Sequence, residues 1–154
     1  MKRRVFLKST LASGALALAA GAGILKPTKV MAAAWPDAAF AAKKYDEGLS
    51  ALMGSASPAE SGEVKIKAPL QAENGAVVPI KIETSLPAEM IAVFAEKNPQ
   101  PLTTVVDLSG GAKGFYSARI KMGATSPVHA IVKAGGKLVR ATQEIKVTVG
   151  GCGG

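Results

Sequence analysis

The residue best suited to chemistry in this sequence is its single cysteine. Cys152 stands third from the end of the chain, and Gly150, Gly151, Gly153 and Gly154 surround it. A structural cysteine is normally buried among apolar side chains, which glycines do not provide. Glycine also loses the most conformational freedom on ordering, so we expect an exposed and mobile segment. Five such residues reach roughly 16–18 Å at about 3.3–3.6 Å each, far enough to present the sulfur inside a narrow site on another protein.

The surroundings of Cys152 favour a carrier thiol over a catalytic one. A nucleophilic cysteine requires an adjacent base or a lowered pKa, and residues 150–154 contain neither a cation nor a helix start. The one histidine, His129, lies in an expected strand, where a histidine with hydrogen-bond partners of its own is the usual case. We therefore expect no Cys152–His129 catalytic pair, and no copper centre that needs two histidines. Two other interpretations stay open: an intermolecular disulfide through Cys152, or an incidental cysteine in a frayed end.

The composition excludes several other functions. Residues 1–34 hold six cations and no acid. Residues 35–154 therefore contain 13 of the 19 Lys+Arg residues and all 11 Asp+Glu residues, which nearly balance. The formal charge of +8 therefore belongs mainly to the N-terminal segment, and nucleic-acid binding loses its support. One cysteine excludes an internal disulfide and one histidine excludes most metal clusters. We expect one domain and no resident metal or cofactor.

Residues 1–34 are typical of an export signal that is later removed. A basic cluster at Lys2–Arg4 precedes an uncharged stretch over residues 9–25, and small residues follow at 32–34. The uncharged stretch is shorter than the roughly 20 strongly apolar residues of a membrane-spanning helix. Cleavage after Ala32 and cleavage after Ala34 both satisfy the small-residue rule. After cleavage we expect no association with a membrane.

Within this signal, the run Arg3-Arg4-Val5-Phe6-Leu7-Lys8 resembles the twin-arginine export motif. Lys2 stands where the motif usually has serine or threonine, and a general secretory signal with coincidental arginines is the alternative. The twin-arginine route carries proteins that are already folded, which predicts a periplasmic protein. Because no cofactor is expected, a partner chain that folds with this one before export would explain the route.

The chain after the signal begins with a helical pattern. Asp37 is a plausible N-cap, and Gly54 can end the helix. The apolar residues between them recur at helical spacing, at Phe40, Tyr45, Leu49 and Leu52. The pattern predicts one amphipathic helix over residues 38–54.

From Gly62 onward the apolar period changes to two, which is typical of strands. Turn residues separate about seven expected strands without a helix between them, which predicts an all-β fold, an immunoglobulin-like antiparallel β-sandwich with an N-terminal helix. Met90–Phe94 is a candidate surface for a partner chain. The expected strands cover residues 64–67, 78–83, 90–95, 103–108, 115–122, 128–133 and 138–149.

The sequence resembles the SoxY family, the sulfur-carrier subunits of the Sox thiosulfate-oxidising system. The carboxyl terminus from Val147 to Gly154 carries the most specific similarity, and residues 96–102, 119–122 and 132–138 are similar as well. The resemblance divides the chain into a twin-arginine signal (1–34), a helix and β-sandwich carrier domain (35–149) and a swinging carrier arm (150–154).

The resemblance implies a carrier without catalytic activity of its own. Cys152 would hold S-thiosulfonate, persulfide and S-sulfonate intermediates, while Gly150, Gly151, Gly153 and Gly154 give the arm reach and a slim profile. The implied partners are a SoxZ-like subunit in a heterodimer, a haem enzyme that conjugates thiosulfate to the thiol, a sulfohydrolase and a sulfur dehydrogenase. The alternative is an exported structural β-sandwich that dimerises through a Cys152 disulfide.

Overall fold

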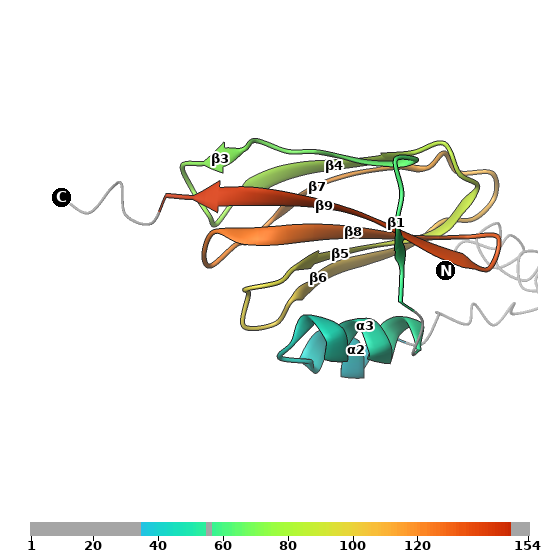
Figure 1. The fold of residues 1–154 in the computed structure, drawn as a ribbon, viewed down its shortest axis with the longest axis horizontal. Helices are drawn as coiled ribbons and strands as arrows, with labels where there is room; N and C mark the ends of the chain where they lie inside the picture. The colour runs from blue at the N-terminus through green and yellow to red at the C-terminus, as the bar shows by residue number, and fades with distance from the viewer. Residues whose placement is uncertain (1–34, 55–56, 149–154) are drawn as a thin grey trace, which may run out of the picture. The chain divides into compact units, whose positions relative to one another are not determined.

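A computed structural model describes residues 35–54 and 57–148, and the chain divides between residues 35 and 36 into two units. The second unit contains the two helices and nine strands of the described residues (Figure 1). The helices are α2 (Asp37–Ala41) and α3 (Tyr45–Met53). The strands are β1 (Ala59–Glu60), β2 (Val64–Lys67), β3 (Gln71–Ala72), β4 (Val78–Thr84), β5 (Ala88–Ala95), β6 (Leu102–Asp107), β7 (Phe115–Ile120), β8 (Ser126–Ala134) and β9 (Lys137–Val147).

The prediction of one continuous helix was wrong. Ala42 leaves the helical conformation and Lys44 is extended, which divides the segment into α2 and α3. Asp37 lies inside the first turn of α2, and Pro36 occupies the N-cap position. In one straight helix Ala39 and Leu49 would lie roughly 80° apart around the axis, whereas the break allows both to be buried. Gly54 ends α3 as predicted, and its N–H donates to the Ser50 carbonyl.

The strands form two sheets. The larger sheet, sheet A, has the order β1-β9-β8-β5-β6 with β3 also on β9, and the smaller sheet, sheet B, has the order β2-β4-β7. The pairs between the longer strands are antiparallel, as predicted. The two-residue strands β1 and β3 were not predicted, and both pair with β9 in parallel. Two residues are too few to show an alternating pattern.

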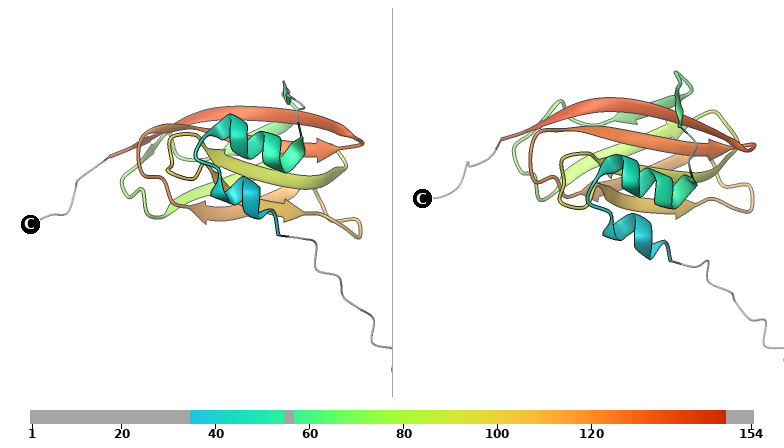
Figure 2. Two further views of the ribbon diagram at one scale, coloured as in Figure 1. Left: turned by 90° about the horizontal axis from the view of Figure 1, so that it is seen from below. Right: turned by 60° about the horizontal axis from the view of Figure 1, so that its bottom comes forward.

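Sheet A is covered on both faces, which places two clusters of buried side chains around it. One cluster lies between the two sheets and includes Ile80 and Ile82 of sheet B with Ile91 and Val93 of sheet A. The other lies between sheet A and the helices, and it includes Leu49 and Phe94. Figure 2 shows α2 and α3 lying across one face of the sheet.

This layering corrects the prediction that Met90–Phe94 offers a surface to a partner chain. The four residues from Ile91 to Phe94 have no exposed surface, because sheet B covers alternate side chains and the helices cover the others. A continuous apolar run is typical of a strand buried on both faces, and β5 is such a strand. These side chains belong to the core and are not available to a partner.

The Phe94 side chain packs between the helices and sheet A. We therefore predict a large loss of stability in Phe94→Ala. Its ring meets Tyr45 edge-on with 5.3 Å between ring centroids, and a Cβ on Gly48 would lie 3.2 Å from it. Truncation should cost about 3–5 kcal/mol in the free energy of unfolding, measured with denaturant. The control is Phe115→Ala, since Phe115 is 50% exposed and should cost under about 1 kcal/mol. Equal losses in the two variants would contradict this assignment.

Candidate functional site

The predicted site residues lie outside the described part of the chain. These are the carrier-arm residues Gly150, Gly151, Cys152, Gly153 and Gly154 and the export-signal residues Arg3, Arg4, Phe6, Leu7 and Lys8. The structure describes the point from which residues 149–154 continue, at the end of β9. We call this region the base, and it consists of residues 70–72 and 146–148.

Hydrogen bonds hold one side of the base. The Lys146 N–H donates to the Leu70 carbonyl at 2.9 Å, and the Thr148 N–H donates to the Ala72 carbonyl at 3.0 Å. The Thr148 hydroxyl donates to the same Ala72 carbonyl at 3.3 Å and accepts from the Gln71 amide at 3.3 Å. Strand β3 and the adjacent Leu70 therefore hold the last residues of β9 in place.

The opposite side of the base is fixed by Thr125 and by a close backbone approach. The Val147 N–H donates to the Thr125 hydroxyl at 3.0 Å, and the Met122 N–H donates to the Gly75 carbonyl at 2.7 Å. A Cβ placed on Gly75 would clash with the Met122 carbonyl oxygen and would lie 2.8 Å from Val147 Cγ1. The end of β9 is thus held on both sides, with Thr148 bonded to Ala72 and Gln71 and Val147 bonded to Thr125.

His129 has hydrogen-bond partners of its own, as predicted. It is 6% exposed on β8, and its Nδ1 lies 3.1 Å from Thr142 Oγ1 while its Nε2 lies 3.0 Å from Glu96 Oε2. The Tyr45 ring lies against the imidazole at 4.4 Å between ring centroids. Both ring nitrogens are engaged inside the body, so His129 is a structural residue beneath the helices.

His129 is one end of a polar cluster that sequence reasoning missed. Glu60 accepts from Arg140 Nε at 2.7 Å and from the Thr142 hydroxyl at 3.0 Å, and Arg140 also donates to the Tyr45 hydroxyl at 3.4 Å. Burial raises the pKa of the Tyr45 phenol, although the bond with Arg140 opposes this shift. That same bond is the main cause of a raised pKa at Arg140.

The cluster fastens helix α3 to β1 and β9. Its members come from four separate elements, and β1 is only two residues long. No residue spacing in the sequence therefore predicts the cluster. The charges compensate each other within the body. The cluster therefore supports the helical layer.

In residues 35–54 and 57–148, no three His, Cys, Asp or Glu side chains are grouped so that they could hold a metal ion. No helix among the described residues is long and apolar enough to cross a membrane.

Comparison with known proteins gives the family. Residues 49–152 match the family model described as "Sulfur oxidation protein SoxY". The chain belongs to the SoxY family. This confirms the resemblance seen in the sequence, and the matched SoxY region contains strands β1 to β9 and ends at Cys152.

The SoxY assignment agrees with a solved structure, "Structure of the sulfur carrier protein SoxY from Chlorobium limicola f thiosulfatophilum". The two chains are 41% identical with a TM-score of 0.63, and the match covers 73% of this chain and 99% of that chain. An endo-beta-1,4-mannanase from Thermotoga petrophila also matches, at 12% identity and a TM-score of 0.41 over 67% of this chain and 23% of that chain, which is too distant to indicate a shared fold. The search of curated proteins found no match.

The contact at Gly75 predicts how the base responds to a single methyl group. In Gly75→Ala the new Cβ collides with the Met122 carbonyl and with Val147, so we expect the free energy of unfolding to fall by about 1–3 kcal/mol. Denaturant unfolding of the mature chain measures this loss. Gly62→Ala is the control, because nothing lies within 4 Å of a Cβ at that position. If both variants keep wild-type stability, the base is not held in the manner described.

Proposed function

We propose that this protein is a periplasmic sulfur-compound carrier whose cargo is bonded to Cys152. The observation that carries the proposal is the match to the SoxY family over residues 49–152, which includes the cysteine. The similar Chlorobium protein is described as a sulfur carrier. The rest of the proposal follows from the chemistry of the C-terminal residues and from the position of the base.

In this proposal, residues 35–149 form the carrier body, an immunoglobulin-like antiparallel sandwich with helices at its N-terminal end. Residues 150–154 form a swinging arm. The bonds that hold Thr148 to Ala72 and Gln71 support this division, because an arm needs a firm attachment to present its thiol at a defined distance. Glycine on each side of Cys152 allows unrelated active sites to accept the same arm.

The proposed chemistry is a cycle on one sulfur atom. A partner removes two electrons and a proton while joining thiosulfate to the Cys152 thiol, which gives an S-thiosulfonate. Hydrolysis then releases sulfate and leaves a persulfide. Oxidation of its outer sulfur by six electrons, with oxygen from water, gives an S-sulfonate, and a second hydrolysis releases sulfate and restores the thiol.

The carrier itself would perform none of these steps and would hold no cofactor. The electrons would leave through a haem enzyme that conjugates thiosulfate and through a sulfur dehydrogenase, and a sulfohydrolase would release sulfate. A SoxZ-like subunit would bind the carrier as a heterodimer. Export of the folded pair by the twin-arginine route, followed by cleavage after Ala32 or Ala34, would place the carrier in the periplasm.

Mass spectrometry of the native chain tests the carrier role. We expect adducts of one sulfur atom or of thiosulfate on Cys152 after growth on thiosulfate, and none on Cys152→Ser, because the serine hydroxyl does not form these bonds. A disulfide-linked dimer without any adduct would instead support the structural β-sandwich alternative. Turnover of thiosulfate by the isolated chain would indicate a thiol enzyme.

Leucine at the arm glycines tests whether a slim profile matters. In Gly151→Leu/Gly153→Leu we expect the haem partner to load Cys152 at least about tenfold more slowly, because the added side chains obstruct a narrow entrance and misplace the sulfur. Stability of the body and reaction of the thiol with a small reagent should stay at wild-type values. Gly62→Leu, at an open position of the body, is the matched control and should load normally. Wild-type loading of the double variant would refute the slim-arm argument.

A further inference from the structure

The short reach of the arm restricts where a partner enzyme can lie. Cys152 is four residues beyond Thr148, a separation of at most roughly 13–14 Å, so an enzyme that takes Cys152 into its active site must come close to Thr148. The body surface around the base then faces the enzyme during each visit. The side chains of that surface are therefore informative about the enzyme's own surface.

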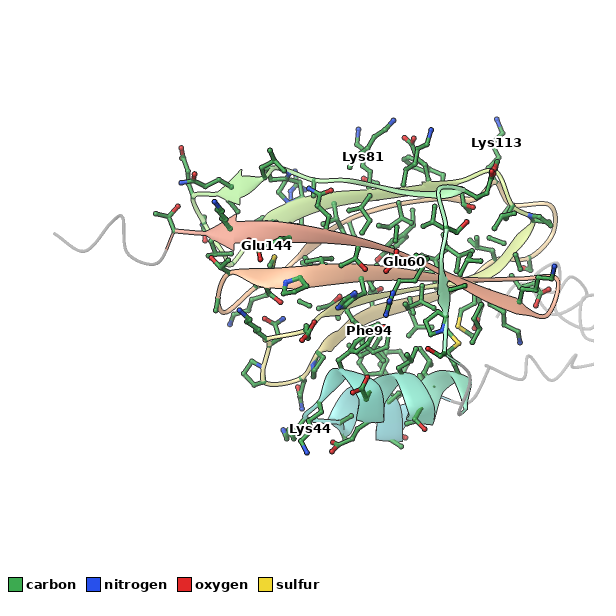
Figure 3. All side chains as sticks on the ribbon, viewed as in Figure 1. Lys44, Glu60, Lys81, Phe94, Lys113 and Glu144 are labelled. Carbon is green, nitrogen blue, oxygen red and sulfur yellow. The ribbon has the colours of Figure 1, made fainter. Side chains whose placement is uncertain are left out.

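Cations collect on the outer face of sheet B near the base. Along β2, β4 and β7, apolar side chains point inward and alternate with exposed ones. The exposed set contains Lys67, Lys81 and Arg119, and Lys121 continues it beyond β7. We call these four residues the basic patch. Figure 3 shows Lys81 pointing away from the body on the side opposite the helices and Lys44.

The charge of the basic patch is poorly compensated within the chain. Lys67 and Lys81 lie directly opposite each other in the β2–β4 ladder, an arrangement of like charges that costs stability. Glu83 is the sole acid within these three strands, and its carboxylate lies 2.7 Å from Lys67 Nζ. Among the described residues, Lys81, Arg119 and Lys121 have no acid within salt-bridge distance.

The basic patch is continuous with the base. The Ala68 carbonyl, next to Lys67, accepts from the Gln143 amide of β9 at 3.1 Å, and the Leu70 carbonyl accepts from Lys146. On the other strands, Arg119 lies opposite Pro79, close in the chain to the Gly75–Met122 contact that holds Val147. Lys67 and Arg119 thus lie near the end of their strands that is close to the base, and Lys81 lies at the middle of β4, directly opposite Lys67.

Apolar surface accompanies these cations. Leu70, a residue of the base, is 74% exposed, and Val77, in the segment that leads from the base to β4, is 48% exposed. A hollow of about 300 Å³ lies between Lys67 and Lys81, with Ala68, Pro69 and Pro79 among its lining residues. Exposed apolar side chains beside cations are typical of a protein-binding surface.

We infer that the basic patch, with Leu70 and Val77, is a docking surface for an acidic protein surface around the active-site entrance of an enzyme that processes cargo on Cys152. This inference rests on the proposed carrier function. The walls of the hollow are mainly apolar, and acidic side chains of the enzyme would meet Lys67 and Lys81 at its rim. The opposite charges speed the encounter, and the docked body places the arm at the entrance.

Two double variants with the same change in net charge test the docking surface. Lys81→Glu/Arg119→Glu reverses the basic patch, and Lys43→Glu/Lys44→Glu reverses two exposed lysines beside the helices. The patch variant should fold, because Glu at position 81 faces Lys67 and replaces a like-charge pair by an opposite one. Unfolding midpoints of both variants check this.

The probe is the purified haem enzyme that conjugates thiosulfate, and the readout is its association rate with the mature carrier. At low ionic strength, where the Debye length is about 30 Å, we expect the patch variant to associate at least about tenfold more slowly than wild type and the helix-side variant to match wild type. The difference should shrink at physiological salt, where the Debye length is about 8 Å.

Adducts on Cys152, measured in the same mixtures, separate this inference from the carrier function. If the patch variant associates and loads like wild type, the docking surface is overturned and the carrier function stands. If association depends on the patch while wild-type Cys152 gains no adduct, the carrier function is overturned, and the patch remains a binding surface for this enzyme without a role in loading. The docking surface would be overturned if association did not depend on salt or if both variants slowed equally. It would also be overturned if the patch bound phosphatidylglycerol vesicles or a second copy of the chain instead of the enzyme.

Discussion

Strand β9 pairs with three other strands along its eleven residues, and this pairing fixes the place where the last residues of the chain leave the body. Its inner edge joins β8 over nine residue pairs, and its outer edge joins β1 near its start and β3 near its end. The same strand supplies Arg140 and Thr142 to the polar cluster beneath α3. The helical layer, the larger sheet and the base are all positioned through this one strand.

The two faces of the body differ in whether their charged side chains have partners of opposite charge. Beneath the helices, cations meet acids at Arg140–Glu60 and the imidazole of His129 meets Glu96. On the outer face of sheet B, Lys81 and Arg119 face solvent without such partners among the described residues. Placing Lys67 opposite Lys81 lowers the stability of the fold. The arrangement therefore calls for an explanation in terms of function.

The sequence predicted the longer strands well, because alternation survives wherever one face of a strand is buried. Val78–Thr84 alternates as expected, and the unbroken apolar run in β5 signals burial on both faces. The helix break at residues 42–44 was missed because it depends on where sheet A lies beneath Ala39 and Leu49. Strands β1 and β3 and the polar cluster were missed because each depends on contacts between distant parts of the chain. The arm itself was read from residue types alone, and residues 150–154 stay a prediction because they lie outside the described part of the chain.

The two short parallel strands also affect how molecules of this protein meet one another. An unpaired strand edge is a template for strands of neighbouring copies and so for aggregation. Ala59–Glu60 and Gln71–Ala72 occupy the outer edge of the longest strand near its two ends, so another molecule would have to displace them to extend the sheet there. A crowded solution of such molecules is thereby protected from growing into stacked assemblies along this edge.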